Sequence, residues 1–169
     1  MLSLWGFAAY ALLYLAVVTG TAMSSPWLRR RLPMAARSSG THTILSLAGL
    51  SASAVHALRG VATPQGDQFA VLGLVGVGVP LALGVVGLYG MILSTVAVYT
   101  RRRLAPWVWR AVHAVAYPAF AAAAWHSIAL GANAWLPAAQ LLYAVTLASA
   151  AGLAGFRVAE MAFAAVGIS

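Results

Sequence analysis

The stretch that decides the fold runs from His42 to His56 and reads H-T-I-L-S-L-A-G-L-S-A-S-A-V-H. A second stretch, from His113 to His126, reads H-A-V-A-Y-P-A-F-A-A-A-A-W-H. These are all the histidines of the 169-residue chain, and they form two pairs, spaced 14 and 13 residues apart. At about 1.5 Å per residue, each pair spans roughly 20 Å of a helix, most of the hydrocarbon thickness of a bilayer. Each stretch therefore predicts a membrane helix with one histidine near each face.

The composition indicates a membrane protein independently of the histidines. Hydrophobic residues make up 63% of the chain and charged residues only 7%, which is too little polar surface to cover a soluble globule. Apolar runs of about 20 residues predict five spans, at residues 4–23, 39–58, 71–99, 108–130 and 135–156. We expect an all-α bundle of five transmembrane helices that forms a single domain over residues 1–169.

The arginines predict the orientation of this bundle in the plasma membrane. Between the first and second spans lie Arg29, Arg30, Arg31 and Arg37, and around the start of the fourth lie Arg101, Arg102, Arg103 and Arg110. Both clusters fall on one side of a five-span model, which the positive-inside rule makes cytoplasmic. The N-terminus is then outside and the C-terminus cytoplasmic. Topology accounts for the net charge of +8, so we expect membrane lipid and no nucleic acid as a partner.

The two histidine-bearing helices are predicted to run in the same direction, so His42 can face His113 across one iron and His56 can face His126 across another. Imidazole is a haem ligand that can stay neutral in a low-dielectric interior. Zinc or copper fits less well, because ligands about 20 Å apart cannot share an ion. The chain also lacks cysteine, which excludes covalent attachment through C-x-x-C-H. We predict two non-covalent b-type haems with these four iron ligands.

The competing interpretation is a haem-free membrane scaffold or transporter, in which the histidines are polar contacts between helices. The 13-residue spacing is also awkward, because it leaves two side chains about 140° apart on an ideal helix. Pro118 lies between His113 and His126 and predicts a kink that re-aims one ligand. The third span contains Pro80 and is predicted to be kinked or tilted.

Arg59 and Arg110 are the predicted partners of the haem propionates. Arg59 follows His56 by three residues and Arg110 precedes His113 by three, so each guanidinium lies about one turn from a ligand. Ordinary topology explains Arg110 better, whereas Arg59 lies at the outer face, where the positive-inside rule predicts no basic residue. Gly49 lies seven residues from both His42 and His56, where it leaves room either for a macrocycle edge or for helix packing.

The residues around His113 carry a family resemblance. Residues 101–117 read R-R-R-L-A-P-W-V-W-R-A-V-H-A-V-A-Y, a basic loop followed by W-R-x-x-H-x-x-x-Y. With the 14- and 13-residue spacings, this resembles the ferric-reductase-like transmembrane domain of NADPH oxidases, ferric-chelate reductases and the membrane haem subunit of the periplasmic methionine-sulfoxide reductase system. The resemblance covers residues 35–131 and is strongest to small stand-alone actinobacterial members. It implies two haems and usually six helices.

The expected function is one-electron transfer across the membrane. No dinucleotide fingerprint is visible, so we expect an oxidoreductase component without a flavin or NAD(P)H domain of its own. A separate cytoplasmic or membrane donor would supply electrons to an outer acceptor, namely a partner redox protein, ferric iron or oxygen. A quinone-linked b-type cytochrome is the alternative within the same chemistry. Whether a flavin or quinone also binds stays open at this point.

Overall fold

The computed structural model describes residues 4–31, 33, 39–61 and 78–165. Regular structure within these ranges is helical throughout, with no strand, which confirms the all-α class. The elements in chain order are α1 (Leu4–Ser24), α2 (Pro26–Arg31), α4 (Ser39–Val61), α6 (Val79–Thr100), the 3-10 turn η1 (Arg101–Arg103), α7 (Pro106–Ala114), α8 (Ala116–Leu130) and α9 (Pro137–Ala165).

Three segments are long and apolar enough to cross a membrane, judged over the described residues by length and composition: Leu4–Ser24, Val79–Arg103 and Pro137–Phe163. They correspond to the first, third and fifth predicted spans. The second predicted span is also helical as α4, which has 23 residues but carries histidine, serine and threonine side chains along its length. The fourth is divided between two shorter helices.

The predicted single helix over residues 108–130 is wrong. It is two helices, α7 and α8, joined at Val115, whose N–H donates to the Val112 carbonyl at 3.2 Å. Pro118 is the third residue of α8, where a missing N–H costs little because the first turn of a helix leaves its N–H groups unpaired. The helix is thus interrupted between His113 and His126, at a residue three positions before the proline and not at the proline itself.

Pro80 does not kink a helix either, because α6 begins at Val79 and the proline is its second residue. Proline suits this position, since its fixed φ is already helical and its missing N–H has no partner in the first turn. The predicted start of this helix at residue 71 lies outside the described residues, as do residues 72–77.

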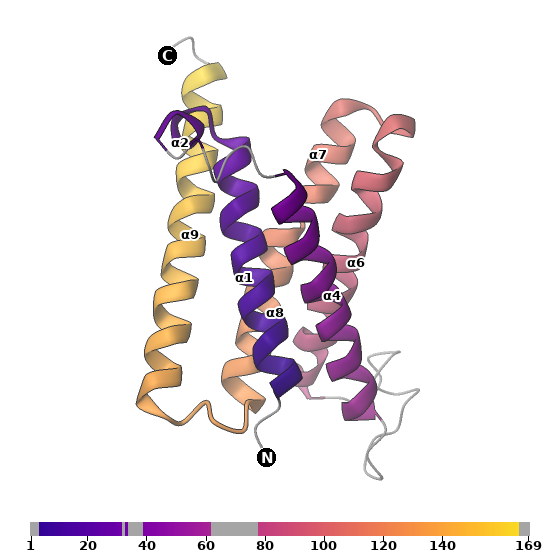
Figure 1. Cartoon of the computed structure of the whole chain (residues 1–169), viewed down its shortest axis with the longest axis vertical. Helices are drawn as coiled ribbons and strands as arrows, with labels where there is room; N and C mark the ends of the chain where they lie inside the picture. The colour runs from indigo at the N-terminus through magenta and orange to yellow at the C-terminus, as the bar shows by residue number, and fades with distance from the viewer. Residues whose placement is uncertain (1–3, 32, 34–38, 62–77, 166–169) are drawn as a thin grey trace.

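The long helices form a bundle with its ends at the top and bottom of Figure 1. Helix α1 packs on both α4 and α8, and α6 packs on both α8 and α4. Helices α4 and α8 therefore face each other across the bundle, with α1 and α6 on either side of the space between them. Helix α9 lies outside this group, against α1 and α8.

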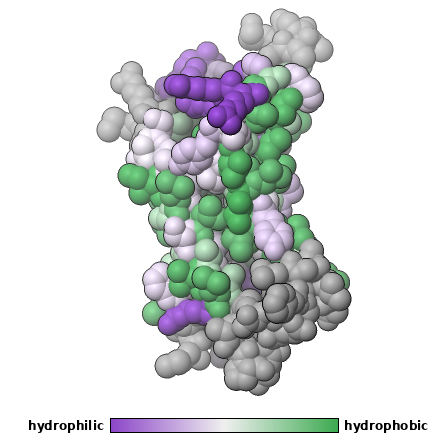
Figure 2. Space-filling model, turned by 90° about the vertical axis from the view of Figure 1, so that its right-hand side faces the viewer, coloured by the Kyte–Doolittle hydropathy of each residue, from purple (hydrophilic) through white to green (hydrophobic). Residues whose placement is uncertain are grey.

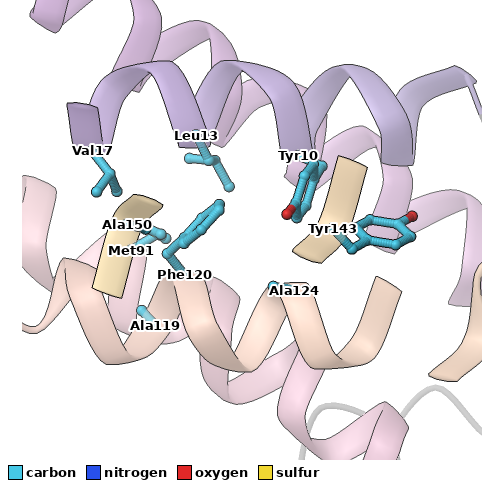
Figure 3. Close-up of a cluster of buried hydrophobic side chains, with 9 residues drawn as sticks. All are labelled: Tyr10, Leu13, Val17, Met91, Ala119, Phe120, Ala124, Tyr143 and Ala150. Carbon is cyan, nitrogen blue, oxygen red and sulfur yellow. The ribbon is translucent and has the colours of Figure 1, made fainter. Parts of the chain in front are cut away.

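The interior is centred on Phe120 of α8, which is 2% exposed. Its ring packs against Tyr10 and Tyr14 of α1, with ring centres 5.5 and 6.2 Å apart, and Figure 3 shows it between α1 and the buried alanines of α8. Tyr143 of α9 meets Tyr10 edge-on at 5.0 Å. This aromatic cluster joins α1, α8 and α9.

Hydroxyl pairs add polar links between the same helices. Tyr10 hydrogen-bonds Thr146, and the hydroxyl oxygens of Tyr14 and Ser149 are 2.8 Å apart. Tyr117, the last residue of the W-R-x-x-H-x-x-x-Y motif, has its hydroxyl oxygen 2.7 Å from that of Thr21 on α1. Such pairs are typical of helix contacts in lipid, where a buried hydroxyl has no water to bind.

The outer surface of the bundle is apolar between polar ends. Large hydrophobic side chains are exposed on α4, α6 and α9, among them Ile44 at 69%, Leu93 at 50% and Leu141 at 66%. Figure 2 shows green hydrophobic side chains along the middle of one face and a purple hydrophilic cluster at one end. Exposed apolar surface of this extent marks a face that contacts lipid or another apolar partner.

Candidate functional site: two pairs of facing histidines

The fold brings the four histidines together in the two pairs that the spacing predicts. The imidazole centres of His42 on α4 and His113 on α7 are 6.2 Å apart, with the ring planes at 90°. Those of His56 on α4 and His126 on α8 are 6.1 Å apart, with the planes at 72°. One helix thus carries a histidine of each pair, and the α7–α8 break lets the other two reach it despite their 13-residue spacing.

The ring separations suit one iron between each pair. An imidazole–metal bond is about 2 Å long, and the ring centre lies about 1 Å behind the bonding nitrogen, so two imidazoles on opposite sides of one metal have centres about 6 Å apart. Both observed separations agree with this value. Two rings in direct contact through stacking would also fall in this range. The orientation of the ring nitrogens therefore distinguishes a pair that can share a metal from a pair that only stacks.

Three of the four histidines have their Nδ1 atom held by a backbone carbonyl of a flanking helix. His42 Nδ1 lies 3.0 Å from the Ala16 oxygen, His113 Nδ1 lies 3.1 Å from the Ser94 oxygen, and His126 Nδ1 lies 2.9 Å from the Pro80 oxygen.. Because a carbonyl only accepts, each Nδ1 must carry the proton. This leaves Nε2 as the unprotonated nitrogen, which is the form that binds a metal.

Two glycines make these hydrogen bonds sterically accessible. A Cβ at Gly20 would lie 2.9 Å from His42 Cε1, and one at Gly84 would lie 2.6 Å from His126 Nδ1. Real side chains do not tolerate such distances, so any larger residue would displace the ring. Each glycine is four residues after its carbonyl acceptor, Gly20 after Ala16 and Gly84 after Pro80. On α1 and on α6, a carbonyl and a glycine four residues later thus form a position that holds one histidine ring, which we call a seat.

His113 has a different seat, in which a serine takes part. The Ser94 hydroxyl donates to the His113 carbonyl at 2.8 Å, and its oxygen lies 3.0 Å from His113 Nδ1. Nδ1–H is therefore shared between the hydroxyl and carbonyl oxygens of one residue. Ser94 is 3% exposed, so both contacts are shielded from solvent. A hydrogen bond of this kind fixes the ring orientation of a ligand histidine and raises its basicity.

The other predicted site residues are exposed or serve packing. Arg59 near the end of α4 and Arg110 on α7 are both exposed, so both guanidinium groups are accessible from outside the bundle. Gly49 packs on α1, because a Cβ there would lie 3.0 Å from Leu13 Cδ2 and 3.2 Å from the Leu13 nitrogen. Its role is the close approach of α1 and α4, one of the two alternatives considered for it.

Sequence reasoning missed the residues that hold the rings, namely Ala16, Gly20, Pro80, Gly84 and Ser94. Three of the contacts use backbone carbonyls, which every residue has, so side-chain chemistry offers no signal for them. The available signal is a glycine in each flanking helix, four residues after the residue whose carbonyl accepts from the histidine. That pattern is too common in membrane helices to identify a site without a fold.

The donor set favours haem over a bare metal ion. Across the described ranges, no group of three or more histidine, cysteine or acidic side chains is placed to hold a metal ion. A structural zinc site needs four protein ligands and a catalytic one needs three. A haem needs only two from the protein, because the porphyrin supplies four nitrogens. Each pair offers two facing imidazoles, and three of the four rings have a protonated Nδ1.

Comparison with known proteins leaves the family open: no family model, curated protein or solved structure matches the chain.

Proposed function

We propose that this protein is a transmembrane b-type cytochrome that holds two haems, one between His42 and His113 and one between His56 and His126, and moves electrons across the membrane. The observation that carries the proposal is that the rings of the two pairs lie 6.2 and 6.1 Å apart while carbonyls hold the Nδ1 atoms of three of the four, which leaves their Nε2 atoms for a metal. The carbonyl contacts of Nδ1 support it, since they select the tautomer that a ligand histidine needs.

The membrane arrangement that we propose has five crossings: α1, α4, α6, the α7–α8 pair and α9. Helix α4 presents Ile44, Leu47 and Leu58 to its surroundings, each at least 40% exposed, as a lipid-facing helix would. The α7–α8 pair covers residues 106–130, roughly 37 Å at helical rise, which is enough for a bilayer. The family that the sequence resembles usually has six helices, so the proposal allows a sixth crossing.

The proposed orientation has α2 and η1 at the cytoplasmic face. The arginines of both elements lie at the end of the bundle where the C-terminus is drawn in Figure 1, opposite the N-terminus. The positive-inside rule makes this end cytoplasmic. The His42–His113 pair is then the inner one and the His56–His126 pair the outer one, in the plasma membrane.

When bound, haem supplies reversible one-electron exchange at its iron. The chain itself would hold the iron through histidine Nε2 atoms, and it supplies the carbonyl contacts that hold the rings and an apolar surrounding that excludes water. Arg59 and Arg110 are the proposed counter-charges for propionates, at the outer and inner ends respectively. Electron relay needs no general acid or base. Glu160, the acidic residue of the described helices, lies at the inner end and binds α2.

The resemblance to the ferric-reductase-like family supports a separate donor and an outer acceptor. On this proposal, a cytoplasmic or membrane donor reduces the inner site, and an extracytoplasmic redox protein, ferric iron or oxygen accepts from the outer site. The protein would be the membrane component of an oxidoreductase. If the donor is a quinol, which is oxidised to a quinone as it gives up its electrons, the protein is a quinone-linked cytochrome of the same diheme type.

The first test is the reduced-minus-oxidised spectrum of the purified protein together with its haem content. Two low-spin b haems per chain are expected, falling to one or fewer in His113→Ala and in His56→Ala. Ser53→Ala is the matched control on α4, because its hydroxyl only donates to the Gly49 carbonyl of the same helix, at 2.8 Å. A colourless protein after expression with added haem would refute the proposal and favour the haem-free scaffold or transporter.

A further inference from the structure

The short helix α2 is fixed to the C-terminal part of α9 by a single carboxylate. Glu160 Oε1 accepts from the Ser25 hydroxyl at 2.8 Å and from the Trp27 N–H at 3.2 Å. The Ser25 hydroxyl oxygen in turn accepts from the Leu28 N–H at 3.1 Å. Ser25 is 0% exposed. A residue 133 positions along the chain from Trp27 therefore completes the cap of α2.

Among the residues that the structure describes, this cap leaves most of the local positive charge without a partner of opposite sign. The other oxygen of Glu160 pairs with Arg157 at 3.3 Å. The last turn of α2 consists of Arg29, Arg30 and Arg31, and Arg31 extends over the Trp27 ring at 5.3 Å. One carboxylate thus serves a cluster of four arginines. The remaining positive charge lies on α2, a helix whose position is fixed by a residue of α9.

Aromatic rings mark the depth of the cluster in the bilayer. Trp27 packs on Phe156 of α9 with ring centres 5.5 Å apart, and both remain partly exposed, at 44% and 37%. Phe156 lies about 29 Å along α9 from Pro137, which is close to the thickness of the hydrocarbon layer. Tryptophan at this level is typical of the headgroup region. The four arginines are therefore at the height of lipid phosphates.

We infer that α2 and residues 156–160 of α9 form a binding site for an anionic phospholipid headgroup in the cytoplasmic leaflet. Arginine forms paired hydrogen bonds with phosphate oxygens, and Trp27 and Phe156 offer an apolar surface beside the first part of an acyl chain. The site does not involve the histidines, so it stands or falls separately from the proposed haems.

The test is binding of phosphatidylglycerol to the full-length protein in mild detergent, counted by native mass spectrometry and compared with phosphatidylcholine. The wild type is expected to prefer phosphatidylglycerol. The triple variant Arg29→Gln, Arg30→Gln, Arg31→Gln should lose at least tenfold of that preference, since each arginine near an anionic headgroup contributes about fivefold. The matched control is Arg101→Gln, Arg102→Gln, Arg103→Gln, which removes the same charge from η1 at the same end and should change the preference less than threefold.

Glu160→Gln separates a built site from general attraction. This variant raises the net charge by one, so a purely electrostatic surface would bind phosphatidylglycerol more tightly. The inferred site predicts weaker binding, because a neutral amide oxygen accepts the Ser25 and Trp27 hydrogen bonds more weakly than a carboxylate does, and the amide nitrogen cannot pair with Arg157. The cap that orients the α2 arginines is therefore weakened. Ser25→Ala removes two of the three hydrogen bonds of this cap without a change of charge and should act in the same direction. Circular dichroism and thermal melting in phosphatidylcholine alone establish that each variant is folded.

Three results would overturn the inference. One is an equal loss of preference in the η1 control, which would mean diffuse attraction to the whole end. The second is tighter phosphatidylglycerol binding by Glu160→Gln. The third is a wild type without preference for phosphatidylglycerol, which would leave the α2 arginines for an acidic protein partner.

Discussion

His126 of α8 is bound to Pro80 of α6: the histidine Nδ1 lies 2.9 Å from the proline carbonyl oxygen. This contact joins a candidate iron ligand to the first turn of a neighbouring helix. The Gly84 position, one turn further along α6, leaves the space in which the ring lies. The orientation of the ligand is thus decided by the backbone of another helix, and disturbing that backbone should affect the site without touching a histidine.

Gly84→Ala is expected to abolish the outer site. The added methyl would lie 2.6 Å from Nδ1 and 2.8 Å from Cγ of His126, so the ring must leave its seat. Haem content should fall from two to about one per chain, which a pyridine haemochrome assay measures. Gly152→Ala on α9 is the control, since nothing lies within 4 Å of its added Cβ, and it should keep both haems. Full occupancy in Gly84→Ala would contradict the seat.

Ser94→Ala is expected to raise the reduction potential of the inner site. The change removes one of the two oxygens near His113 Nδ1, which lowers the basicity of the ligand and favours the ferrous state. One hydrogen bond contributes about 1 kcal/mol, so the shift should be about 40 mV or less. Spectroelectrochemical titration of both sites measures it.

The matched variant is Thr95→Ala, because the Thr95 hydroxyl donates only to the Met91 carbonyl of its own helix, at 2.8 Å. Its potentials should equal those of the wild type. A wild type with two haems in which Ser94→Ala moves neither potential would refute the tuning role of Ser94 and leave the haem proposal intact.

Tyr117→Phe should destabilise the bundle by about 1 kcal/mol, the typical net contribution of one buried hydrogen bond. It removes the link between the Tyr117 hydroxyl and Thr21, which is 0% exposed. Thr21 keeps its bond to the Val17 carbonyl, so the loss is limited to the contact between helices. Unfolding in a detergent series measures the change. Tyr99→Phe, at a residue that is 68% exposed, should behave as the wild type, and an equal loss in both variants would argue against the link.

Phe120→Ala should be the most destabilising of these substitutions. The ring is 2% exposed and contacts Tyr10 and Tyr14, and its removal from a packed interior costs about 3 kcal/mol. The loss here is mainly of van der Waals contact, because lipid replaces water as the surroundings. Phe163→Ala, at a residue that is 55% exposed on α9, is the control. Comparable melting temperatures for the two variants would show that the aromatic cluster does not hold the helices together.

The sequence by itself determined the helical class and the partners within each histidine pair. Both follow from periodicity and spacing: apolar runs predict helices, and two helices that run in the same direction bring residues of matching depth together. The pairs His42–His113 and His56–His126 are found facing each other. The chemistry of the pairs is a proposal, whether it is argued from the sequence or from the structure. Two imidazole rings about 6 Å apart define a geometry but do not identify the group between them.

Only the tertiary structure decided how each ring is held and where the helices begin and break. The acceptors of Nδ1 are carbonyls of Ala16, Ser94 and Pro80, and a carbonyl has no sequence signature. The helix breaks at Val115, and α6 starts beside Pro80. Both features depend on which turn of a helix contains a proline. The cap of α2 by Glu160 joins segments more than 130 residues apart. Such contacts are set by which helix faces pack together, and local patterns along one chain segment carry no information about that choice.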